Sequence, residues 1–156
     1  MNTIKNNSIT IGEYFKSYLE KKQFNIDFLL DYIDTYDITN LYNKEEFLML
    51  YYKIIPENNN KNLTKKIKKD FNVISDISPH FLSRLLMRFK DNNAVVLFNK
   101  INKLINSGYY KQITSNNTKF MRLKDNDIIV IYKGSTNVVI SIFKNKREES
   151  ENICSL

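Results

Sequence analysis

The stretch YYKQITSNNTKFMRLKDNDIIVIYKGSTNVVISIF, residues 109–143, decides the fold class. Within it, four short runs (YYKQIT, KFMRLK, DIIVIYK and NVVISIF) alternate apolar and polar residues with the period of two that is typical of β-strands. The separators SNNT, DN and GST consist of residues that favour tight turns. Four strands joined by tight turns predict an antiparallel meander sheet.

Two amphipathic helices are predicted before the sheet. The first begins at Ser78, a good N-cap, with Pro79 at the first helical position. The second runs from about Asn92 to Asn106, and Gly108 is a natural stop. One face of the sheet must be covered, and these two helices are the available cover. The buried stripe of the first helix is formed by Leu82, Leu85, Leu86 and Phe89.

The N-terminal half has the apolar spacing of helices. Three are expected: one after a capping box of Thr10 and Glu13, one over residues 28–36, and one over residues 44–55 that ends before Pro56. The stretch PENNNKN, residues 56–62, is predicted to be a loop. The complete fold class is therefore α+β, with N-terminal helices followed by two helices packed on a four-stranded antiparallel meander sheet.

Charge divides the chain at this loop. Residues 1–60 carry 6 Lys+Arg against 9 Asp+Glu, a net charge of −3, and residues 61–156 carry 18 against 8, a net charge of +10. We therefore expect an acidic helical region over residues 1–60, a basic α+β region over 61–147 and a tail over 148–156. The acidic region is either part of the same domain or a cover. The basic region predicts a polyanionic partner, and an inert basic surface is the alternative.

Several classes of protein do not fit this composition. Cys154 is the only cysteine and His80 the only histidine, which excludes a disulfide framework and a Cys/His zinc site, so we expect neither metal nor cofactor. Three glycines leave little scope for a loop that cradles phosphate. No apolar run is long enough to span a membrane, so we expect no membrane partner. A single cysteine fits a reducing compartment, so we expect a cytoplasmic location.

His80, Arg84 and Arg88 stand at i, i+4 and i+8 and share one stripe of the predicted helix. Arginine binds phosphate oxygens bidentately and stays charged. Histidine has the side chain whose pKa suits proton transfer near neutrality. The stripe is therefore a candidate site for cleaving RNA without a metal, in which a base, an acid and cations act on one phosphate. A solvated helix face is the alternative interpretation.

The missing acid or base would come from the sheet. Polar residues interrupt the apolar strands at Arg122, Lys124, Tyr132 and Ser141, with Lys133 beside them. The alternative is that these residues form the outward face of an alternating strand. Cationic residues of the basic half are candidate RNA contacts, and they are Lys65, Lys66, Lys68, Lys69, Arg122, Lys124 and Lys133.

A helix with H-x3-R-x3-R, a second helix and a four-stranded sheet, in this order, resembles the barnase–EndoU–colicin–RelE superfamily of nuclease and toxin domains. The segment SPHFLSRLLMRF, residues 78–89, is also similar in pattern to the RegB-like phage endoribonucleases. The resemblance covers roughly residues 75–144. It implies a metal-independent ribonuclease that leaves a 2′,3′-cyclic phosphate. It also implies catalytic roles for His80, Arg84 and Arg88, and for Ser141 as the polar residue of the last strand.

The chain departs from this pattern in one respect, because RegB-like enzymes rely on a second histidine and this chain has none. Either an Arg, Lys or Tyr replaces it, as in RelE-like members, or the fold is present without the activity. The leading hypothesis is a metal-independent endoribonuclease, toxin-like or a phage mRNA-decay factor, whose partner is RNA and which a protein inhibitor could regulate. The alternative is a non-catalytic phage or mobile-element protein that binds RNA or a host nucleoprotein complex, such as an inhibitor of host defence. A third hypothesis is a protein–protein module that docks through its acidic half.

Overall fold

The computed structural model describes residues 8–38, 40–107, 112–114 and 117–145, with only the backbone described for 112–114 and 117–119. These residues form an α+β fold, as the sequence predicts. The helices are α1 (Ile11–Lys21), α2 (Asp27–Thr35), α3 (Leu41–Ile54), α4 (Glu57–Phe71), α5 (Pro79–Phe89) and α6 (Ala94–Ser107). The strands are β1 (Asp76–Ile77), β2 (Gln112–Thr114), β3 (Asn117–Lys124), β4 (Ile128–Lys133) and β5 (Val138–Lys144).

The sheet has the order β1-β5-β4-β3-β2 and is mixed, so the prediction of a purely antiparallel four-stranded meander is wrong. Strands β2 to β5 do pair with their neighbours in antiparallel fashion, but β1 adds a parallel strand beside β5, with Asp76 opposite Val138 and Ile77 opposite Val139. A strand of two residues is too short to show a period in the sequence, and only its long-range pairing defines it.

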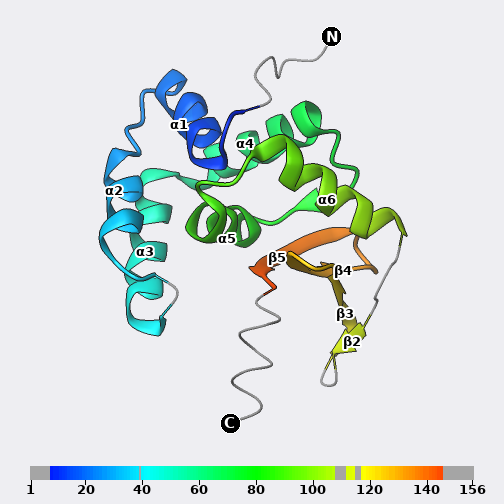
Figure 1. The fold of residues 1–156 in the computed structure, drawn as a ribbon. Helices are drawn as coiled ribbons and strands as arrows, with labels where there is room; N and C mark the ends of the chain where they lie inside the picture. Colours follow the sequence, from blue (N-terminus) through cyan, green and yellow to red (C-terminus); the bar gives the residue numbers. More distant parts are fainter. Residues whose placement is uncertain (1–7, 39, 108–111, 115–116, 146–156) are drawn as a thin grey trace.

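The helices gather on one side of the sheet (Figure 1). The strand register aligns Leu123, Val130 and Ile142 across β3, β4 and β5, and all three are buried beneath the helices. Side chains of directly paired residues lie on the same face of a sheet, and neighbours along a strand alternate. Arg122, Ile131 and Ser141 are the neighbours of these residues along the strands and pair with one another, so they lie on the opposite face, where Ser141 is nevertheless buried.

Helix α5 begins as the sequence predicts and is the central helix of the fold. The Ser78 hydroxyl accepts a hydrogen bond from the backbone N–H of Phe81 (3.0 Å), and Pro79 occupies the first turn. The same hydroxyl donates to the carbonyl of Ile140 (3.1 Å) and so ties the start of the helix to β5. Helices α1, α3 and α4 also contact α5. Polar groups on α5 consequently lie in interior seams between elements.

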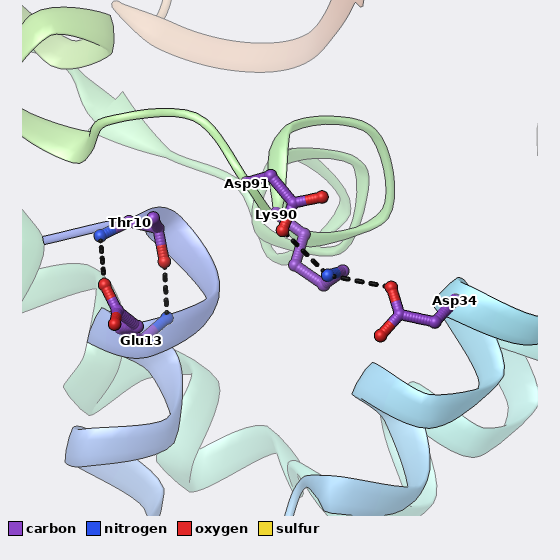
Figure 2. Close-up of polar contacts among 5 residues, drawn as sticks. All are labelled: Thr10, Glu13, Asp34, Lys90 and Asp91. Atoms are coloured by element: carbon purple, nitrogen blue, oxygen red, sulfur yellow. Dashed lines mark hydrogen bonds and ion pairs between the residues drawn. The ribbon is translucent and has the colours of Figure 1, made fainter.

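The N-terminal helices dock on the turn between α5 and α6. Helix α1 begins with the predicted capping box, in which Thr10 and Glu13 exchange hydrogen bonds (Figure 2). The backbone N–H of Gly12 donates to the carbonyl of Lys90 (2.8 Å). The Lys90 ammonium in turn lies 2.9 Å from an Asp34 carboxylate oxygen on α2 and 2.8 Å from one of Asp91. One turn therefore connects α1, α2 and α5.

Residues 57–62 are helical, so the prediction of a loop over 56–62 is wrong. Helix α4 starts at Glu57, directly after Pro56, and continues through the lysine-rich segment to Phe71. Asn60 is buried, where its amide donates to the carbonyl of Ile55 (2.9 Å) and its side-chain oxygen accepts from the Tyr51 hydroxyl (2.9 Å). Hydrogen bonds to the end of the preceding helical segment thus override the preference of asparagine for loops.

In the described part of the chain, no helix has the length and apolar character that crossing a membrane requires. The expected stop at Gly108 and the expected tail over residues 148–156 lie outside the described residues.

Candidate functional site

His80, Arg84 and Arg88 form one stripe of α5, as predicted, and the stripe runs along the seam between α3 and the edge of β5. Arg88 reaches the sheet, where its Nη1 donates to the carbonyl of Ile142 (2.8 Å) and its guanidinium lies 4.3 Å from the ring centre of Phe143. The edge of β5 is open to this contact because β1 pairs only with Val138 and Val139 of β5. The stripe is thus in direct contact with the sheet.

Arg84 is the most buried member of the stripe. Only 6% of its surface is exposed, and its Nη1 has no hydrogen-bond partner among the described residues. A buried cationic N–H group without an acceptor costs free energy, on the order of 1–3 kcal/mol or more. Such a group requires an acceptor, which a water molecule or an anionic ligand can supply.

Helix α3 supplies a further cation that the sequence analysis did not select. Lys44 lies close enough to lower the pKa of His80, and its own pKa is lowered by burial and by the charges of Arg84 and Arg88. Tyr52 lies two turns along α3 and close to Arg84, where its phenol partly offsets the effect of burial on the pKa of that arginine. Lys44 and Tyr52 stand at i and i+8, a spacing that places them on one face of α3. We call Lys44, His80, Arg84 and Arg88 the cationic cluster.

Burial and the nearby positive charges keep the imidazole of His80 neutral at pH 7. Burial, followed by the charges of Arg84, Lys44 and Arg88, lowers the pKa of His80 to about 4. Burial and the charge of Arg84 lower the pKa of Arg88 to about 10, so this guanidinium stays protonated at neutral pH. At pH 7 the cluster therefore presents three cations around a neutral, proton-accepting imidazole.

Carboxylates do not balance these charges in the described part of the chain. Every ion pair recorded there involves other lysines, namely Lys16, Lys61, Lys66, Lys68, Lys90 and Lys100. Like charges that face one another repel, and the repulsion is relieved when an anion binds between them. The arrangement is therefore suited to a phosphate group.

The structure does not bring Ser141 to the imidazole. Ser141 pairs with Ile131, which pairs with Arg122, so these side chains lie on the face of the sheet opposite Leu123, Val130 and Ile142. No hydrogen bond joins Ser141 to the α5 stripe among the described residues. The register places Lys124 and Lys133 on the same face as Arg122. The Tyr132 hydroxyl is hydrogen-bonded to the side chain of Asn137.

The candidate RNA contacts on α4 divide into two kinds. Lys66 and Lys68 have carboxylate partners, at 3.1 Å from Asp70 and 2.6 Å from Asp76 respectively. Lys65 and Lys69 are exposed. Only the second pair is thus open to a polyanion without loss of an ion pair.

Within the described residues, no group of three or more His, Cys, Asp and Glu side chains is arranged to hold a metal ion. Comparisons with protein-family models, with curated proteins and with solved structures gave no match for this chain.

Proposed function

We propose that this protein is a metal-independent endoribonuclease that binds an RNA phosphate in the cationic cluster. The observation that carries the proposal is the buried, unpaired Nη1 of Arg84 next to a neutral imidazole and two further cations. Guanidinium groups recognise phosphate oxygens, and a neutral imidazole can accept a proton. Together they provide the minimum set of groups for attack by the 2′-OH.

In the proposed reaction, Arg84 and Arg88 hold the non-bridging oxygens of the scissile phosphate. His80 takes the proton of the 2′-OH while O2′ forms a bond to phosphorus and the bond from phosphorus to O5′ breaks. The ammonium of Lys44 gives a proton to the departing O5′. The products are a 2′,3′-cyclic phosphate and a 5′-hydroxyl, and the two arginines stabilise the charge that develops on the phosphorane.

Phosphate binding also adjusts the base. An imidazole with a pKa of about 4 is a weak base in the free protein. An anion beside it favours the imidazolium and so raises the pKa toward neutrality. The substrate would therefore improve the base that acts on it.

The test is incubation of labelled RNA with the purified protein in EDTA, followed by mapping of the new ends. We expect 2′,3′-cyclic phosphate ends, and a rate that falls about 100-fold or more in His80→Ala while RNA binding is retained. Lys103→Ala, which removes an exposed lysine of α6 that is not a candidate RNA contact, is the matched control and should change the rate little. A rate that His80→Ala leaves unchanged would remove His80 from the mechanism.

A non-catalytic RNA-binding protein is the second candidate. It is favoured by the position of Ser141 on the opposite face of the sheet, which leaves Lys44 as the only proposed acid. This alternative predicts binding that weakens steeply with salt and RNA that stays intact. End mapping in EDTA separates the two candidates.

A further inference from the structure

A cleft of about 520 Å³ adjoins the cationic cluster, between the C-terminal end of α2, the end of α5 and the end of β5. This volume is in the range of small-molecule sites and suits a nucleobase with its ribose. Its walls include Asp34, Tyr36, Arg88, Lys90, Asp91 and Phe143. Arg88 belongs to both the cleft and the cationic cluster, so a ligand in the cleft can reach the phosphate site.

Two aromatic side chains of the cleft are open to a ligand. Tyr36 is 49% exposed and Phe143 is 37% exposed, although large aromatic rings are usually buried. The guanidinium of Arg88 already lies over the ring of Phe143. Aromatic and guanidinium planes are the surfaces on which nucleobases stack.

The polar groups of the cleft suit a base better than a second phosphate. The Lys90 ammonium pairs with the Oδ1 atoms of Asp34 and Asp91 at the wall of the cleft (Figure 2). The Oδ2 atom of each has no hydrogen bond recorded among the described residues, and a carboxylate oxygen only accepts. The lining holds three cationic and three carboxylate side chains, so its charge gives no particular preference for a second phosphate, whereas the amino and ring N–H groups of a base could donate to these oxygens.

We propose that the cleft binds the base of the nucleotide whose phosphate occupies the cationic cluster, and that it prefers bases with an exocyclic amino group. This inference rests on the proposed phosphate site but not on cleavage. It assigns the acidic N-terminal half a role in substrate selection, because α2 and the segment after it supply Asp34 and Tyr36.

Calorimetric titration with inorganic phosphate and with the four ribonucleoside 3′-monophosphates tests the proposal. We expect the nucleotides with an amino group to bind at least about tenfold more tightly than phosphate, and uridine 3′-monophosphate to bind more weakly than they do. Tyr36→Ala should abolish most of this difference while affinity for phosphate stays the same. Asp34→Asn should reduce the preference for amino-bearing bases. Tyr42→Ala is the matched control, because Tyr42 is 88% exposed and does not line the cleft.

The outcomes separate this proposal from the preceding one. Selective nucleotide binding by a protein that leaves RNA intact would support the cleft and refute cleavage. Equal affinity for phosphate and all four nucleotides would overturn the cleft proposal whether or not RNA is cut. An unchanged nucleotide-to-phosphate ratio in both Tyr36→Ala and Asp34→Asn, with melting temperatures like that of the wild type, would also overturn it.

Discussion

The pKa of His80 should lie far below its usual range in the free protein and should rise when an anion enters the cluster. Burial is the largest cause of the lowered pKa, which is about 4, and Arg84, Lys44 and Arg88 add to it. The chain has one histidine, so its imidazole resonances can be followed by NMR without an assignment problem.

The magnitude of the upward shift follows from Coulomb's law. A unit negative charge about 6 Å from the imidazole, at an effective dielectric constant of about 20, interacts by roughly 3 kcal/mol. One pKa unit corresponds to about 1.4 kcal/mol, so the limit is about two units. Salt screening reduces this value. We expect saturation with inorganic phosphate to raise the pKa of His80 by about one to two units.

Two variants of one residue separate charge from burial. Arg84→Met removes a positive charge at similar length, so the pKa of His80 should rise in the free protein and the phosphate-induced shift should shrink. Arg84→Lys keeps the charge and should leave the free-protein pKa lowered. A pKa of His80 near 6.5 in the wild type that does not change when phosphate is added would refute the electrostatic description of the site.

Three further predictions follow from individual contacts. Because the folded protein excludes the proton from His80, the unfolded chain binds more protons between about pH 4 and pH 6.5. The free energy of unfolding of the wild type should therefore fall as the pH drops through this window. Measured by urea titration at pH 7 and at pH 4.5, the loss should be about 1–3 kcal/mol larger in the wild type than in His80→Gln. Ser141→Ala should leave RNA cleavage within about twofold of the wild-type rate, because the side chain lies on the opposite face of the sheet, and a loss of about 100-fold would contradict that placement. Asn60→Ala should lower the free energy of unfolding by about 1–3 kcal/mol, since it leaves the Tyr51 hydroxyl and the Ile55 carbonyl unpaired in the core, and an unchanged urea midpoint would argue against these bonds.

Local chemistry made much of the fold predictable. The Ser78–Pro79 start of α5 and the capping box at Thr10 depend on residues within one helical turn, and both are present in the structure. The strands β3, β4 and β5 follow from period-two patterns that are also local. Features decided by distant partners could not be predicted in this way. They include the pairing of β1 with β5. The helical start of α4 depends on nearer partners that still lie beyond one helical turn, because Asn60 accepts a hydrogen bond from Tyr51 of α3.

The candidate site shows the same division. The spacing of His80, Arg84 and Arg88 within one helix was sufficient to align them, but nothing in that helix indicates that α3 lies across it. Lys44 and Tyr52 have the i, i+8 spacing of a stripe, but their own segment does not indicate which element the stripe faces. Ser141 is a candidate because it is a polar residue in an apolar strand and because the resemblance implies a catalytic role for it. The face on which it lies depends on a register that shifts between Ile131 and Tyr132, opposite β5. A single strand sequence contains no record of such a shift.

The division of charge along the chain takes on a different meaning in three dimensions. The net charges of −3 and +10 predict an acidic region that is either part of the same domain or a cover, and the cationic cluster takes Lys44 from this acidic half and His80 from the basic half. Lys90 of the basic half is held by Asp34 of the acidic half at the wall of the adjoining cleft. One hydrophobic core runs through both halves, and α4 continues across the point where the charge changes. A chain that began at residue 61 would therefore lose a cation of the proposed phosphate site, a wall of the proposed base site and part of the core on which α5 packs.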